Sequence, residues 1–168
     1  MYSTLLHKPR NSGRFASLME LYEQNYLLMR LLAPELRQMS AGPFISSSPD
    51  VLSLELLDLV HDRYTSTFTL TYRFSDDDPR GRNVCEPNLT IRLYHDARSC
   101  EVMSGLLPQG RELRRTRDLE EGRRLNRFLN KWLRYCLRQG HGFRQQNGLV
   151  DDHADNLAVH ARRYCTQC

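Results

Sequence analysis

The chain has 168 residues, 40% hydrophobic and 9% aromatic, which suits one domain with its own core and excludes a chain that is disordered throughout. No stretch approaches the ~20 apolar residues that span a bilayer, and Met1 to Arg14 has no signal-like apolar run. Five cysteines, an odd number in a chain with no export signal, predict reduced thiols, so we expect a cytoplasmic protein.

The N-terminal part predicts a leader and then a helix. Residues 1–13 show little periodicity and predict a mobile leader, and a single domain is expected over 14–142. Between residues 14 and 32, apolar side chains recur at steps of three and four, the spacing of one helical face. Pro34 is expected to end this helix, and the Ser, Pro and Gly of residues 39–50 predict a linker within the domain.

Four strands in two hairpins are expected next. Residues 64–74 alternate aromatic or apolar side chains with threonines, which is typical of a strand with one buried and one wet face. Residues 51–60 are apolar on both parities and predict a more completely covered strand. A second hairpin is predicted from strands near 89–94 and 100–104, after a polar loop over 76–83.

A long amphipathic helix is expected to close the domain. Asp118 with Glu121 three residues later resembles a capping box, and Gly140 or Gly142 is a natural stop. The apolar side chains between them cluster with Trp132 on one side. The order helix, two hairpins, helix predicts an α+β fold: an antiparallel sheet of about four strands with both helices packed on one face.

Three segments carry a family resemblance: LMELYEQNYLLMRLL, LTIRLYHDARSCEV and LNRFLNKWLRYCLRQGHG. They resemble the YqiB-like bacterial family, a domain of unknown function, over roughly residues 15–142. The resemblance implies a bacterial, cytoplasmic protein and supplies no activity, substrate or catalytic residue.

The first candidate site is the polar side of the last helix. Residues 111–138 hold ten Arg or Lys against four Asp or Glu, so this segment has a net charge of +6 while the rest of the chain has −2. We use the term arginine face for six residues that fall within one arc of the helix: Arg123, Arg124, Arg127, Lys131, Arg134 and Arg138. Such a face could meet phosphates, an acidic protein or an anionic membrane surface, or it is simply solvated. Nucleic acid is the less favoured ligand, because no aromatic side chain interleaves with the cations.

The second candidate lies in two turns. In an up-and-down meander, the turns His61-Asp62-Arg63 and His95-Asp96-Ala97-Arg98 lie at the same end of the sheet. His61, Asp62, His95 and Asp96 could form an acid/base site or hold a metal or phosphate. The alternative is ordinary turn chemistry, in which an aspartate bonds its own backbone.

The third candidate is the tail over 143–168, which contains His153, His160, Cys165 and Cys168. These are zinc-ligand types, and His141 could replace one histidine. The alternative is a tail with exposed thiols and no cofactor, because one Cys-x-x-Cys at the extreme end is a weak signal.

The fourth candidate is the far side of the first helix, where Leu27, Leu28 and Leu31 lie away from the main apolar stripe. A helix that is apolar most of the way round is either enclosed in a core or covered by another chain. A homodimer or another protein partner is therefore expected at these leucines, with burial inside the domain as the alternative.

No P-loop, dinucleotide fingerprint, nucleophile elbow or zinc-protease motif is present in the chain. The leading hypothesis is therefore a non-catalytic binding or adaptor protein that self-associates and presents the arginine face to an acidic or phosphate-bearing partner. The competing hypothesis is a small enzyme that acts on a phosphate-containing small molecule through the histidine and aspartate turns.

Overall fold

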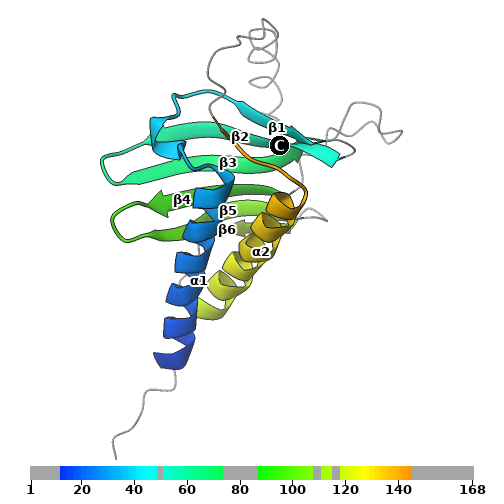
Figure 1. Cartoon of the computed structure of the whole chain (residues 1–168). Helices are drawn as coiled ribbons and strands as arrows, with labels where there is room; N and C mark the ends of the chain where they lie inside the picture. The colour runs from blue at the N-terminus through cyan, green and yellow to red at the C-terminus, as the bar shows by residue number, and fades with distance from the viewer. Residues whose placement is uncertain (1–11, 49–50, 74–86, 108–110, 115–117, 145–168) are drawn as a thin grey trace, which may run out of the picture.

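The computed structural model describes residues 12–48, 51–73, 87–107, 111–114 and 118–144. The described elements are helix α1 (Ser12–Leu32), a 3-10 turn (Leu36–Gln38), strands β1 (Phe44–Ser48), β2 (Val51–His61), β3 (Thr65–Arg73), β4 (Asn88–Tyr94), β5 (Ser99–Leu107) and β6 (Arg111–Arg114), and helix α2 (Leu119–Arg138). Figure 1 shows this order along the chain.

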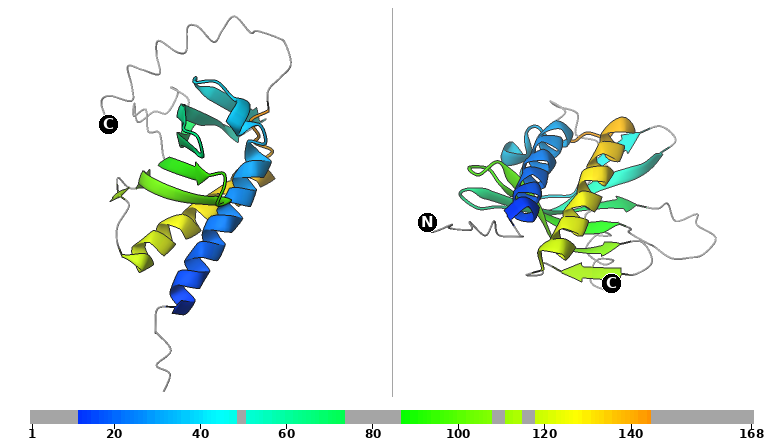
Figure 2. Two further views of the ribbon diagram at one scale, coloured as in Figure 1. Left: turned by 90° about the vertical axis from the view of Figure 1, so that its left-hand side faces the viewer. Right: turned by 90° about the horizontal axis from the view of Figure 1, so that it is seen from below.

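The six strands form one antiparallel meander in the order β1-β2-β3-β4-β5-β6. Both helices lie on the same face of this sheet, as two views show (Figures 1 and 2). The expected α+β class, the two hairpins and the placement of both helices on one face are therefore confirmed. The sheet has two strands more than expected, one at each edge.

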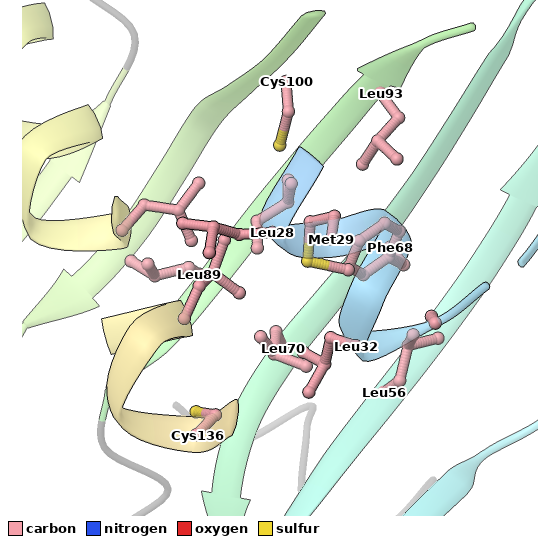
Figure 3. Close-up of a cluster of buried hydrophobic side chains, with 14 of the residues drawn as sticks. Leu28, Met29, Leu32, Leu56, Phe68, Leu70, Leu89, Leu93, Cys100 and Cys136 are labelled. Atoms are coloured by element: carbon pink, nitrogen blue, oxygen red, sulfur yellow. The ribbon is translucent and has the colours of Figure 1, made fainter. Parts of the chain in front are cut away.

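The core lies between the helices and the sheet. On β3, residues Ser66, Phe68, Leu70 and Tyr72 are buried, whereas Thr65, Thr67 and Thr69 on the other parity are half-buried. The alternation therefore predicts the buried face of β3 correctly, although Thr71 on the other parity is buried as well. Figure 3 shows α1, α2 and the middle strands meeting around Met29, Leu32, Phe68, Leu70 and Leu89.

Two boundaries differ from the sequence-based expectation. The segment 39–50, expected to be a linker, contains β1, which pairs with β2 through Phe44↔Leu56 and Ser46↔Leu54. Phe143, placed at the start of the tail by the sequence, is buried in the core, and its backbone N–H donates to the carbonyl of Leu32 at 2.7 Å. The chain therefore stays packed against α1 beyond the end of α2.

A bulge shapes the end of β2. The register shifts between Leu57 and Val60, and Asp58 takes a positive φ of 53°. A bulge of this kind bends a strand and re-aims the side chains that follow it. Beyond it, His61 pairs with Ser66 of β3, which positions one of the predicted site residues.

Candidate functional site

The arginine face of α2 points to solvent because the opposite side of the helix is packed in the core. Asp118 caps the helix by accepting a hydrogen bond from the backbone N–H of Glu120 at 2.9 Å. Trp132 is buried, as are the side chains that share its side of the helix: Leu125, Leu129, Leu133 and Cys136. The docking of the tryptophan side on the sheet obliges the cations on the other side to face solvent.

Five of the six residues in the arginine face are exposed, and Arg123 is half-buried. Within the described part of the chain, no carboxylate lies at ion-pair distance from any of the six. The ion pair that is described there joins Arg73 to Glu55, on strands β3 and β2. The Nε–H of Arg134 donates to Oδ1 of Asn130 at 3.0 Å, which holds that guanidinium in a fixed position.

Three buried asparagines fix α2 against α1, and sequence reasoning missed them. The side-chain amide of Asn25 has no exposed surface and donates to the carbonyl of Asn126 at 3.2 Å. Its Oδ1 accepts from the Nδ2 of Asn130 at 3.0 Å. Oδ1 of Asn126 accepts from the backbone N–H of Val102 on β5 at 3.1 Å. The position of the arginine face relative to α1 and the sheet therefore depends on a polar network inside an apolar layer.

Helix α1 exposes part of the predicted partner surface. Leu27 and Leu31 have exposed fractions of 63% and 65%, so both side chains face solvent in the single chain. The expectation that Leu28 belongs to this surface is wrong, because its exposed fraction is 9% and its side chain points into the core (Figure 3). The exposed leucines of this helix are therefore Leu27 and Leu31.

The two predicted turns meet, as the meander order requires, and they meet around a serine. The hydroxyl of Ser66 lies 2.8 Å from Nδ1 of His61 and 2.7 Å from Nε2 of His95. The Nε2 of His61 lies 3.0 Å from the carbonyl of Met39. We call these four residues the histidine cluster.

The carbonyl of Met39 can only accept, so it fixes the direction of the hydrogen bonds. Nε2–H of His61 donates to that carbonyl, so Nδ1 of neutral His61 accepts from the hydroxyl of Ser66. Oγ of Ser66 then accepts from Nε2–H of His95. The Nδ1 of His95 is buried and has no hydrogen-bond partner in the described part of the chain. The cluster therefore favours the neutral form of His95, because protonation would add a buried donor.

The surroundings of His95 also favour its neutral form. Burial lowers the pKa of His95, and the nearby guanidinium groups of Arg37 and Arg30 lower it further, while the carboxylate of Asp96 opposes them. The ring of Tyr26 on α1 packs edge-on against this imidazole, with centroids 6.5 Å apart.

The two aspartates of the turns do not join the imidazoles. Asp62 and Asp96 are exposed, and Oδ2 of Asp62 accepts from the hydroxyl of Thr65 within its own turn at 3.4 Å. Ser66 has no exposed surface, so a substrate cannot reach its hydroxyl in this conformation. The arrangement joins two hairpins and the chain after α1. Within it Ser66 and Met39 are buried, His95 is half-buried and His61 is exposed.

A cavity among the described residues lies away from the histidine cluster. It has a volume of about 420 Å³ and is lined by α1, the β4–β5 hairpin and the start of α2, including Leu18, Met19, Tyr94 and Leu125. The hydroxyl of Tyr94 donates to Oε1 of Glu101 at 2.7 Å. Neither histidine of the cluster lines this cavity, so it gives no support to chemistry at the turns.

No group of three or more histidines, cysteines or acidic side chains placed to hold a metal is found among the described residues. His141 is buried, and its Nδ1 donates to the carbonyl of Ser46 on β1 at 3.1 Å. The predicted tail ligands His153, His160, Cys165 and Cys168 lie outside the described residues.

The described helices include none long and apolar enough to cross a membrane.

Comparison with known proteins gives a consistent family. A model for proteins of unknown function, DUF1249, matches residues 27–142, which include the arginine face and the histidine cluster. The uncharacterized protein YqiB of Escherichia coli K12 is 30% identical over 137 residues, covering 78% of this chain and 94% of YqiB. YqiB of E. coli O157:H7 matches with the same identity and coverage. No solved structure matches the chain.

Proposed function

The chain belongs to the DUF1249 family, and we propose that it acts in the cytoplasm as a non-catalytic binding protein. Its arginine face receives an acidic or phosphate-bearing partner, and its α1 surface supports self-association. The observation that carries this proposal is the set of exposed cations on α2 with no described carboxylate at ion-pair distance from them.

The spacing of these cations suits an extended anion. Arg124, Arg127, Lys131, Arg134 and Arg138 follow one another at steps of three and four residues, so they form a single row. At 1.5 Å of rise per residue, the row is about 21 Å long. A row of this length addresses several negative groups at once, and its attraction weakens as salt screens it.

Acidic side chains of a partner protein and phosphate groups fit this row better than nucleic-acid bases do. Tyr135 is the exposed aromatic residue of α2, with 43% of its surface exposed. Single-strand binders stack successive bases on several rings, and one tyrosine provides one such contact. Nucleic acid therefore stays the less favoured ligand.

The self-association part rests on Leu27 and Leu31, which lie four residues apart on the outer side of α1. Side chains at this spacing are neighbours on a helix, so the two leucines form one apolar contact surface. Covering them with a second chain would remove apolar area from water, which favours association.

The binding proposal is tested by replacing Arg127, Lys131, Arg134 and Arg138 with glutamine. A control variant with the same net charge replaces four exposed arginines elsewhere: Arg37, Arg63, Arg98 and Arg144. Inorganic polyphosphate and polyglutamate serve as probes in calorimetric titrations. At about 0.5 kcal/mol per exposed ion pair, loss of four cations predicts about 2 kcal/mol, or roughly thirtyfold weaker binding.

The control variant should bind within about twofold of the wild type at equal ionic strength. Equal weakening of both variants would mean that net charge, and not the arginine face, attracts the anion. Unchanged binding by the α2 variant would remove the arginine face from the proposal.

The competing proposal is an enzyme built on His61, Asp62, His95 and Asp96 that acts on a phosphate-containing small molecule. One observation favours it, since the two imidazoles do meet, through Ser66. The burial of Ser66 and the outward placement of both aspartates count against it. Turnover of a phosphate monoester that disappears in a His95→Gln variant with an unchanged melting temperature would decide for the enzyme.

A further inference from the structure

The outer side of α1 is complementary to the outer side of α2. On α1, Glu20 and Glu23 are exposed, and Leu27 and Leu31 follow them towards the end of the helix, where the exposed Arg30 adds one cation beside the two leucines. On α2, the exposed row is cationic throughout. One chain therefore presents an acidic and apolar strip beside a basic strip.

The asparagine network sets which parts of the two helices lie level. Asn25 contacts α2 at Asn126 and Asn130, and both helices run in the same direction (Figures 1 and 2). On the N-terminal side of this contact, Glu20 and Glu23 of α1 lie level with the first part of the basic row of α2. On the C-terminal side, Leu27 and Leu31 lie level with the later part of the basic row.

We infer that the occupant of this surface is a second copy of the chain, related by a two-fold axis that runs along the helices. Leu27 and Leu31 of the two copies meet near the axis. Glu20 and Glu23 of each copy face Arg124 and Arg127 of the other. This inference rests on the self-association part of the proposed function and specifies its partner and geometry.

Charge decides the direction of the axis. A two-fold axis in the interface but perpendicular to the helices would lay α2 directly on the α2 of the other copy, cation against cation. Like charges in direct opposition are unfavourable, so this arrangement is rejected. An axis along the helices sets α1 of each copy over the groove between α1 and α2 of the other, and each acid–base contact occurs twice.

The interface leaves part of the arginine face available. Lys131, Arg134 and Arg138 lie beyond the positions that Glu20 and Glu23 reach, so a dimer still presents cations to an anionic partner. Two leucines and two acidic residues from each copy make a small contact. The dimer is therefore weak and becomes weaker as salt screens its charges.

A charge exchange tests the inference. One variant carries Glu20→Arg and Glu23→Arg, and the other carries Arg124→Glu and Arg127→Glu. All four side chains are exposed, so both variants should fold, which circular dichroism and the melting temperature check. In sedimentation velocity at low salt, each variant alone should dimerise at least tenfold more weakly than the wild type.

An equimolar mixture of the two variants should restore the dimer, because both sets of contacts become acid against base again. A Leu27→Ser, Leu31→Ser variant should be monomeric at concentrations where the wild type is dimeric. A mixture that stays monomeric, a leucine variant that dimerises like the wild type, or a wild type that is monomeric throughout would overturn the inference.

Polyphosphate binding separates this inference from the wider proposal. The Leu27→Ser, Leu31→Ser variant keeps every cation, so as a monomer it should still bind polyphosphate. If no dimer forms while this binding persists, the two-fold interface is refuted and the anion-binding proposal stands. If the dimer forms as described and polyphosphate does not bind, the anion-binding proposal fails alone.

Discussion

The asparagine network between the helices yields the most sharply defined stability prediction. Replacement of Asn25 by alanine removes one hydrogen bond to the carbonyl of Asn126 and one from the amide of Asn130. Each bond contributes about 1 kcal/mol net, and a buried polar group left without a partner costs about 1–3 kcal/mol. The amide of Asn130 is buried and loses its acceptor, so we expect the variant to lose about 3 kcal/mol of unfolding free energy.

Urea denaturation followed by tryptophan fluorescence measures this loss, because Trp132 is the one tryptophan of the chain. Asn25→Leu, which restores much of the lost volume, separates the polar contribution from the packing contribution. It should be destabilised like Asn25→Ala, because leucine also leaves Asn130 without an acceptor. A double-mutant cycle with Asn130→Ala should give a coupling of about 1 kcal/mol. A leucine variant as stable as the wild type, or a coupling near zero, would refute the reasoning.

Three further predictions concern histidines, a thiol and a core ring. Burial lowers the pKa of His95 and of His141 below the ordinary 6.5, so the folded protein resists protonation that the unfolded chain accepts. Their contribution to stability is therefore present above pH 6.5 and is lost as the pH falls below it. Urea titrations at a series of pH values check this, and a His95→Gln, His141→Gln variant should show a smaller loss; an identical loss would contradict it. Burial raises the pKa of Cys136 to about 11, so alkylation followed by peptide mass mapping should leave this thiol unmodified in the native protein at about pH 8 and label it in urea; equal labelling in both states would show that it is accessible. Phe143→Ala should cost about 3–4 kcal/mol by opening a cavity at the end of α1, whereas a loss below about 1 kcal/mol would place Phe143 in the tail.

The regular elements were predictable because their patterns are local. The threonine alternation of β3 and the apolar side of α2 each appear within one stretch of sequence, so the buried faces follow directly from periodicity. The exposure of the arginine face follows in turn, because a helix that docks by one side must expose the other.

The edge strands were not predictable in the same way. Phe44–Ser48 is a short segment with three serines, which by itself is typical of a loop. It becomes a strand because β2 offers a free edge and because its serines bind the end of α2: Oγ of Ser48 donates to the carbonyl of Gln139 at 2.7 Å, and Oγ of Ser46 accepts from the N–H of Gly142 at 3.0 Å. Long-range contacts of this kind have no local signature.

The candidate sites also differ in how much of each could be predicted from local sequence. The meeting of His61 and His95 was predictable from the meander order, but the role of Ser66 between them required the register of β2 against β3. Asn25 had a signal that could have found it, since an asparagine three residues after Tyr22 and four before Met29 sits on the apolar stripe. A polar residue in that position predicts a buried partner.

The central claim is that the arginine face is where this protein binds anions, and side-chain NMR tests it most directly. Titration with polyphosphate at low salt, observed through assigned arginine Nε–Hε resonances, should shift Arg134 and Arg138 and leave Arg63 and Arg98 in place. Shifts spread evenly over all the exposed arginines, or confined to those outside α2, would contradict the account.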